Sequence, residues 1–273
     1  MSSILDEAKK PVDTPIIVTI YGQPGTGKTS LACTLPRPVY LISSPGESVP
    51  RDLPDSLRPA TIGTTDSVEK LWQQTEALVR EKHKFRTIVI DSVSGFDALF
   101  ADHVTQKSGA DSLARANGGY GAGYSAVLQL HTRLRRDAEL LRARGRNVVF
   151  LAHSQLKQIE PPDSDSFSQY SIMLGEKFVG PYINAVDLVG FLREKTAVTA
   201  RDGSHNRAVS VGWRELIAHT NPAAVTKNRL GITEALSVER GVNPLAGFFT
   251  APKPPLVVSD GDAAGHEQSQ SAE

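Results

Sequence analysis

The chain has 273 residues, 40% of them hydrophobic, and its 30 Lys and Arg are balanced by 30 Asp and Glu. This length suits one large domain or two small ones, and the apolar runs fall far short of the roughly 18 residues needed to cross a bilayer, which excludes a membrane protein. Cys33 is the only cysteine, which excludes an intrachain disulfide and a metal site built from several cysteines. No secretory signal is visible, so we expect a cytoplasmic protein.

Strand-like and helix-like segments alternate along the chain. Short β-branched or apolar runs predict strands, and apolar residues at helical spacing predict helices. The predicted strands cover residues 16–21, 38–43, 87–91, 147–152, 185–193, 197–200 and 207–211. The predicted helices cover residues 29–35, 66–82, 96–105 and 124–144. Thr65 or Asp66 is the expected N-cap of the second helix, and a turn at Asp202 and Gly203 would join the last two strands. Residues 156–177 are predicted to be irregular.

This alternation predicts an α/β fold, in which right-handed crossovers build a mainly parallel, twisted sheet flanked by helices. Continuous apolar runs fit strands that are buried on both faces. We expect a flexible lead at residues 1–14 and one core at residues 15–250 that ends in a β-hairpin. Residues 251–273 carry one lysine against four acidic residues and predict a disordered acidic tail.

A phosphate-binding motif follows the first predicted strand. Residues 22–29 read GQPGTGKT and match the pattern G-x-x-x-x-G-K-[ST]. In this pattern backbone N–H groups surround the phosphates of ATP, the lysine binds their outer oxygens, and the last hydroxyl ligates Mg²⁺. The predicted nucleotide-binding residues are Gly22, Gln23, Pro24, Gly25, Thr26, Gly27, Lys28, Thr29 and Ser30.

Two acidic residues are candidates for the chemistry on the phosphate chain. Asp91 ends a predicted strand, where an acid would hold the Mg²⁺ shell together with Thr29; the alternative is a cap for the next helix. Ser92 follows it, at a position where many AAA+ motors carry a water-activating glutamate, and the absence of that glutamate argues against that branch or against hydrolysis altogether. The nearest acid after the second strand is Glu47, which we assign as the catalytic base, the alternative being a solvated loop acid.

Five motifs together point to a family. YGQPGTGKTS, TIVIDSVSGF, NVVFLAHSQ, DLVGFL and TKNRLG occur in this order within residues 15–240. In this the chain resembles phage-encoded RecA-like ATPases, the phage nucleotide-binding proteins that act as single-strand annealing recombinases. TKNRLG is similar to the Lys-Asn-Arg-Phe-Gly motif of the RadA branch, with Leu230 in place of Phe.

The resemblance implies a RecA-like P-loop core that uses ATP and Mg²⁺, binds single-stranded DNA and assembles into a ring or filament. It also allows contact with a single-strand DNA-binding protein through either partner's tail. His153, or as second choice Gln155, would sense the γ-phosphate and switch with it; the alternative is a strand-end polar residue satisfied by backbone. Lys227 and Arg229 would reach a neighbouring subunit's ATP or the DNA backbone, unless they form a solvated basic turn.

Two segments correspond to DNA-binding loops in this reading, residues 108–123 and 155–177. Both contain basic and aromatic residues that would contact phosphate and stack on bases, although plain surface loops are the alternative. The expected function is a DNA-stimulated ATPase that anneals or exchanges strands in phage recombination. A protein remodeller or helicase loader, a small-molecule kinase, and a nucleotide-gated binding protein without significant turnover remain alternatives.

Overall fold

The computed structural model describes residues 14–43, 47–163, 165–201 and 204–249, and only the backbone between residues 196 and 211. The strands are β1 (Ile17–Gly22), β2 (Pro38–Ser43), β3 (Ala60–Thr65), β4 (Thr87–Asp91), β5 (Asn147–Ile159), β6 (Phe167–Ile172), β7 (Leu188–Arg201), β8 (Ser204–Ile217), β9 (Lys227–Asn228) and β10 (Leu236–Val238). The α-helices are α1 (Lys28–Cys33), α2 (Val68–Arg80), α3 (Val93–Ser108), α4 (Ala122–Ala143) and α5 (Glu176–Ile183).

One sheet organises the described part of the chain, in the order β10-β8-β7-β1-β5-β4-β2-β3. The strands from β7 to β3 in this order run parallel, while β8 and β10 are antiparallel additions at one end. The prediction of a mainly parallel α/β fold with a β-hairpin near the C-terminal end is confirmed. Because these strands run parallel, the ends of β1 and β4 lie at one edge, at the level of residues 151–153 in the middle of β5.

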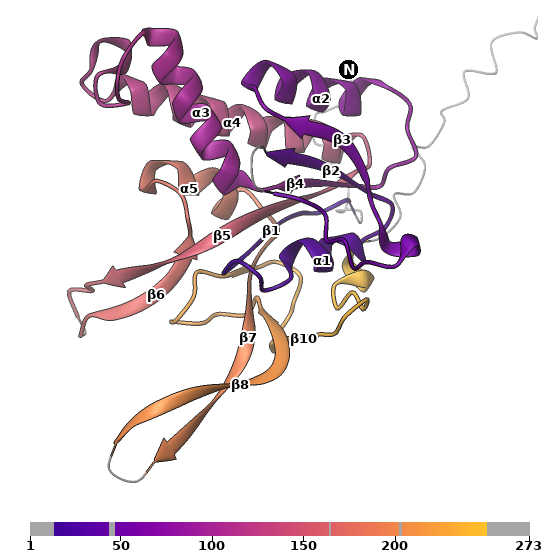
Figure 1. The fold of residues 1–273 in the computed structure, drawn as a ribbon, viewed down its shortest axis with the longest axis vertical. Coiled ribbons are helices and arrows are strands. Elements are labelled where there is room, and N and C mark those ends of the chain that lie inside the picture. Colours follow the sequence, from indigo (N-terminus) through magenta and orange to yellow (C-terminus); the bar gives the residue numbers. More distant parts are fainter. Residues whose placement is uncertain (1–13, 44–46, 164, 202–203, 250–273) are drawn as a thin grey trace, which may run out of the picture.

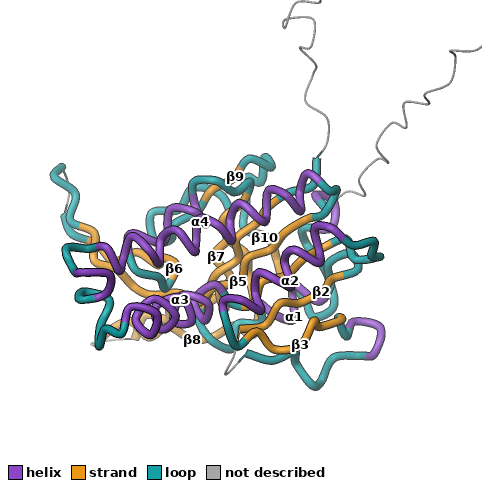
Figure 2. Tube along the Cα trace, turned by 90° about the horizontal axis from the view of Figure 1, so that it is seen from above, coloured by secondary structure: helices purple, strands orange, loops and turns teal. Residues whose placement is uncertain are grey.

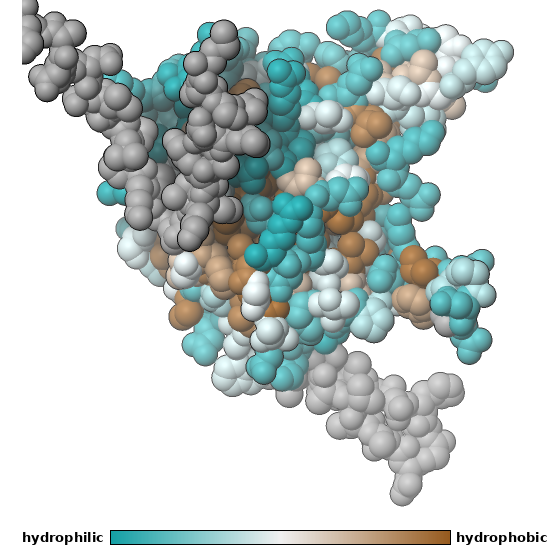
Figure 3. Space-filling model, turned by 180° about the vertical axis from the view of Figure 1, so that it is seen from behind, coloured by the Kyte–Doolittle hydropathy of each residue, from teal (hydrophilic) through white to brown (hydrophobic). Residues whose placement is uncertain are grey.

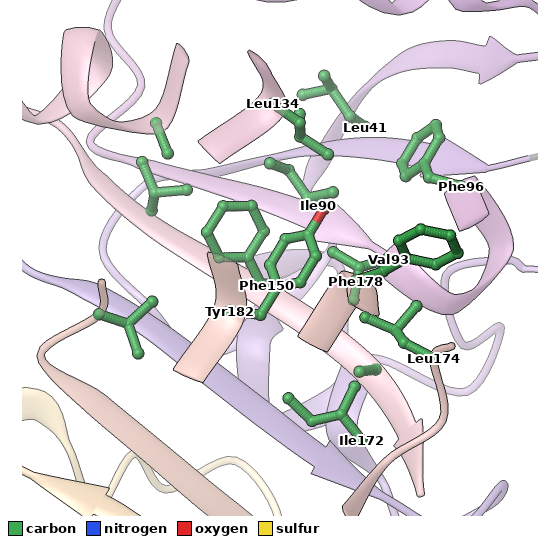
Figure 4. Packing of buried hydrophobic residues seen from close by; sticks show 14 of the residues in the cluster. Leu41, Ile90, Val93, Phe96, Leu134, Phe150, Ile172, Leu174, Phe178 and Tyr182 are labelled. Carbon is green, nitrogen blue, oxygen red and sulfur yellow. The ribbon is translucent and has the colours of Figure 1, made fainter. Parts of the chain in front are cut away.

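Each face of the sheet packs against its own apolar core. Helices α2, α3 and α4 lie on one face (Figure 2). On that side Ile17 and Tyr21 of β1 join a cluster in which Phe150 lies beside Tyr182, with ring centroids 5.0 Å apart (Figure 4). Val18 of β1 points to the opposite face and packs with α1, since successive side chains of a strand alternate. A strand buried on both sides explains the continuous apolar run that predicts β1.

The prediction of irregular structure at residues 156–177 is wrong. β5 continues to Ile159 and forms an antiparallel hairpin with β6, and α5 begins at Glu176. The hairpin projects from the body (Figure 1), and in the view from behind it stands clear of the mostly hydrophilic surface (Figure 3). Because few of its side chains are buried, its sequence has no apolar alternation that would predict strands. The edge strand β3 is largely exposed and lacks a signal for the same reason.

Other differences concern boundaries. The strands predicted at residues 185–193 and 197–200 belong to the single strand β7, and residues 207–211 lie within β8. The N-cap of α2 is Ser67, whose Oγ accepts from the Lys70 N–H at 3.3 Å, instead of Thr65 or Asp66. The predicted turn at residues 202–203 lies outside the described residues, as do the tail predicted at 251–273 and all but the last residue of the predicted lead.

Candidate nucleotide-binding site

The loop between β1 and α1 is a tight turn whose shape depends on glycine. Gly25 and Gly27 have φ angles of 79° and 87°, which other residues adopt only with strain. Gly22 ends β1, and a Cβ there would collide with the carbonyl oxygen of Leu192. The Thr26 hydroxyl closes the turn by donating to the Gln23 carbonyl at 2.8 Å. The backbone therefore has the compact form that a phosphate-binding loop requires.

Lys28 lies folded over this loop and is only 7% exposed. Its Nζ donates to the carbonyl oxygens of Gly22 and Gln23, each at 3.0 Å. Burial lowers the pKa of the ammonium, while the charges of Asp91 and Glu47 oppose this shift. A buried ammonium with only backbone carbonyls as hydrogen-bond partners is a strong position for binding an anionic group.

Thr29 and Asp91 meet across the sheet edge. The Thr29 hydroxyl donates to Asp91 Oδ2 at 2.9 Å, and Asp91 is only 2% exposed. Burial, together with the nearby charge of Glu47, raises the pKa of the Asp91 carboxyl to about 6. A hydroxyl beside a carboxylate suits Mg²⁺, which takes few protein ligands and completes its shell with water and phosphate oxygens. Within the described residues no cluster of three or more acidic, His or Cys side chains forms an independent metal site.

Glu47 lies at the same edge, held by two donors. Its Oε1 accepts from His153 Nε2 at 2.9 Å and from the Ser92 hydroxyl at 3.1 Å. The hydrogen bond from His153 lowers the pKa of Glu47 against the opposing effect of burial. The backbone N–H of His153 donates to Ser94 Oγ at 3.1 Å, and its Nδ1 is buried without a hydrogen-bond partner. Glu47 is thus ionised and fixed in direction.

These groups surround one cavity of about 590 Å³. It is lined by Pro24, Gly25, Gly27, Lys28, Thr29, Ser30, Ser43, Glu47, Pro50, Asp91, Ser94, Gly95, His153 and Met173. The structure therefore brings most of the predicted loop together with Asp91, Glu47 and His153. The register explains this meeting, because Gly22 at the end of β1 pairs with His153 on β5.

Gln155 is placed elsewhere. Its amide bridges the β5–β6 hairpin by donating to the carbonyl oxygens of Ile172 at 2.9 Å and Leu174 at 3.1 Å. It is not among the residues that line the cavity. Of the two predicted γ-phosphate sensors, only His153 faces the site.

Lys227 and Arg229 lie at the opposite, amino edge of the sheet. Strand β9 pairs with the start of β7, where Lys227 Nζ donates to the Asn184 carbonyl at 2.5 Å. Arg229 lies 3.9 Å from Asp187. Within one chain neither residue is near the cavity.

Sequence reasoning missed Arg214 of β8. Its guanidinium lies against the α-carbon of Gly27, so closely that a Cβ at Gly27 would collide with Arg214 Nη1. Within the described residues no carboxylate forms an ion pair with Arg214. The sequence carries no motif at this position, and only the pairing of β8 with β7, next to β1, brings the side chain to the loop. Sequence reasoning also did not identify Ser43 and Ser92 as site residues. The backbone N–H of Ser92 donates to Ser43 Oγ at 3.2 Å.

Comparison with known proteins agrees with this geometry. The family described as AAA domain matches residues 14–230, which is most of the chain. No curated protein matches the chain significantly. Among the described helices, none combines the length and the apolar character needed to span a membrane.

Proposed function

The chain belongs to the AAA domain family of P-loop ATPases, and we propose that it binds ATP with Mg²⁺ in this cavity and hydrolyses it at Glu47. The observation that carries the proposal is the convergence of Lys28, Thr29, Asp91 and Glu47 on one cavity at the carboxyl edge of a parallel sheet. Nucleotides bind at this edge in open α/β sheets, and a buried lysine, a hydroxyl and two acids supply the groups that phosphoryl transfer needs.

Phosphate binding follows from the loop. Its N–H groups and the Lys28 ammonium would surround the terminal phosphates, whose negative charge restores the charged state that burial disfavours. Thr29 and Asp91 would hold Mg²⁺, which when bound neutralises charge that develops on the phosphate oxygens. The raised pKa of Asp91 fits this role. Burial disfavours the ionised carboxylate, and a bound Mg²⁺ would stabilise that ionised form.

Glu47 is the best-placed general base for the attacking water. Its lowered pKa keeps it ionised at neutral pH, so it can accept the proton that the water loses. His153 holds Glu47 through Oε1, which leaves the second carboxylate oxygen free to orient water. We propose that the γ-phosphate competes for the His153 imidazole, so that ATP binding alters the support of the base.

Arg214 would add a cation from β8 beside the loop. Its guanidinium has no ion pair within the described residues and already touches Gly27, one residue before Lys28. An arginine binds phosphate through two parallel hydrogen bonds, so this position supports a contact with the nucleotide from within the same chain.

Single-stranded DNA is the proposed partner, and strand annealing in phage recombination the proposed role. Support comes from side chains near the β5–β6 hairpin and the start of α4. Tyr120 is fully exposed, and the Lys177 ammonium lies 5.4 Å from the ring centroid of Tyr124. Exposed rings beside cations are the groups that stack on bases and contact phosphate. In a ring or filament, Lys227 and Arg229 would face a neighbouring subunit; contact with a single-strand DNA-binding protein stays a prediction.

A nucleotide-gated binding protein with little turnover is a second candidate. One observation favours it: Oε1 of Glu47 is already occupied by both His153 and Ser92. If binding of ATP leaves these bonds in place, only the second carboxylate oxygen can meet the water, and two donors on Oε1 make the carboxylate a weaker base. Such a protein would bind ATP tightly and hydrolyse it slowly.

The test combines nucleotide retention with turnover. Full-length protein should retain MgATP in equilibrium dialysis, and Lys28→Ala should lose most of that retention. Phosphate release measured with and without single-stranded DNA, alongside annealing of complementary oligonucleotides, then separates the two candidates. Failure of the wild-type chain to bind MgATP, or unchanged retention in Lys28→Ala, would overturn the proposed site.

A further inference from the structure

An arginine precedes each of four neighbouring strands at the amino edge of the sheet, opposite the cavity. Across the order β3-β2-β4-β5 these residues are Arg58, Arg37, Arg86 and Arg146. The registers place the last three at one level, because Pro38 pairs with Thr87 and Thr87 pairs with Asn147. Arg58 joins them, since Ala60 pairs with Val39. We call these four residues the arginine row.

Backbone hydrogen bonds fix the level of the row. The Arg86 N–H donates to the Arg37 carbonyl at 3.1 Å, and the Asn147 N–H donates to the Arg86 carbonyl at 2.9 Å. Adjacent strands lie about 4.8 Å apart, so four of them span roughly 14 Å. The backbone spacing of the row is therefore set largely by the sheet.

Most of this charge is uncompensated. Within the described residues no ion pair involves Arg37, Arg86, Arg146 or the neighbouring Lys84. Arg58 has a carboxylate 3.4 Å away, on the almost fully exposed Asp55, and such a contact contributes little.

The cations also border a cavity. Arg37, Arg58 and Lys84 line a hollow of about 660 Å³ that has no acidic residue in its lining, and Phe85 forms part of its wall. On the other side of the row, Arg146 donates to the His83 carbonyl at 3.4 Å, while its Nε is buried without a partner. A cavity with several cations and no acid favours an anionic ligand.

We propose that the arginine row binds the phosphate backbone of a nucleic acid, on the edge of the sheet opposite the ATP site. Regularly spaced guanidinium groups match a polymer with a phosphate at each repeat, and arginine binds phosphate with two parallel hydrogen bonds. At about 3.4 Å per nucleotide in a stacked strand, the row would follow roughly four nucleotides. The inference rests on the proposed function for the identity of the polyanion, but it needs neither ATP nor hydrolysis.

DNA binding at the arginine row can be distinguished from DNA binding at residues 108–123 and 155–177. A fluorescent thymidine 20-mer should be titrated with full-length protein, without nucleotide, at several salt concentrations. The row variant replaces two arginines of the row and the neighbouring lysine, by Arg37→Gln, Arg86→Gln and Lys84→Gln combined. The matched control removes three cations that form exposed ion pairs elsewhere, by Lys70→Gln, Arg80→Gln and Arg240→Gln. A loop variant, Arg115→Gln with Lys157→Gln, tests the other edge.

The row variant should bind the oligonucleotide roughly tenfold more weakly at low salt, and the slope of log affinity against log salt should fall by about 2, since each single-strand phosphate contact contributes about 0.7. The control should match the wild type. Unchanged affinity and slope in the row variant, or a loss confined to the loop variant, would overturn the inference. So would row-dependent binding of a polyglutamate peptide without binding of DNA. Without DNA, ATP turnover of the row variant should equal that of the wild type, which separates this inference from the proposed function.

Discussion

At the carboxyl edge of the sheet the charged groups of the cavity are partnered: Lys28 by backbone carbonyls, Asp91 by Thr29, and Glu47 by His153. At the amino edge Arg37 and Arg86 have no carboxylate partner among the described residues. The first arrangement buries a few groups and shifts their pKa values, while the second leaves cations near solvent. The difference teaches that one sheet can build a chemical site at one edge and a purely electrostatic surface at the other.

The largest expected effect concerns Glu47 at the carboxyl edge of the sheet. Glu47→Gln should keep MgATP binding and reduce turnover by roughly 100-fold or more, because an amide accepts no proton from water. Phosphate release and nucleotide retention are measured on the same preparation. Asp55→Asn, an exposed acid at the other edge, is the control. Turnover within twofold of the wild type would remove Glu47 from the mechanism.

Arg214→Ala should weaken MgATP binding roughly tenfold, since a charge-assisted hydrogen bond contributes on the order of 1.5–3 kcal/mol. The control is Arg193→Ala on the same hairpin, which pairs with Glu215 at 2.8 Å and points to the other face. Calorimetric titration with ATP, ADP and adenosine measures the effect. If adenosine loses as much affinity as ATP, the contact with phosphate is refuted.

His153→Ala should shift the acidic limb of the turnover profile to higher pH. The hydrogen bond from His153 is the main cause of the lowered pKa of Glu47, so its removal raises that pKa, and protonation then disables the base at a higher pH. His103→Ala removes an imidazole that lies 3.7 Å from Glu69, and it should leave the limb in place. An unmoved limb in the His153 variant would mean that the imidazole does not support the base.

The smallest expected effect concerns stability. The folded pKa of Asp91 is about 6 against an ordinary 3.8, so the folded state binds the proton more tightly and loses stability as pH rises from about 4 to about 6. Asp91→Asn removes this penalty, so its nucleotide-free Tm should exceed that of the wild type by a few degrees at pH 8 and by less at pH 4.5. Thermal unfolding at both pH values measures it. An equal difference at both would show that the Asp91 charge is not the cause.

The sequence predicted which residues meet at the carboxyl edge of the sheet far better than it predicted the rest of the molecule. Buried parallel strands leave continuous apolar runs, and the loop at residues 22–29 has a spacing that phosphate chemistry dictates. The core strands and the positions of Lys28, Thr29 and Asp91 at the cavity could therefore be predicted from the sequence. Strand β3 and the β5–β6 hairpin bury little and leave no such pattern.

Residues that are brought together only by strand order and register could not be predicted from the sequence in this way. Arg214 reaches the loop only because β8 lies beside β7, and the arginine row exists only because four strands begin at one level. Neither fact is written in local composition, since strand order is decided by packing over the whole chain. Gln155 shows the reverse case: it belongs to the motif NVVFLAHSQ, but its side chain binds backbone carbonyls at the base of a hairpin.

The uninterrupted course of β5 has a mechanical consequence. The strand passes through the middle of the sheet, presents His153 to the cavity and runs on without a break to Ile159 in the projecting hairpin (Figure 1). Because β5 and β6 are paired along their length, a rotation of the backbone at His153 would displace residues of the hairpin more, the farther they lie from the sheet. We expect a molecule bound to the hairpin to be displaced when a nucleotide binds, with no separate hinge required.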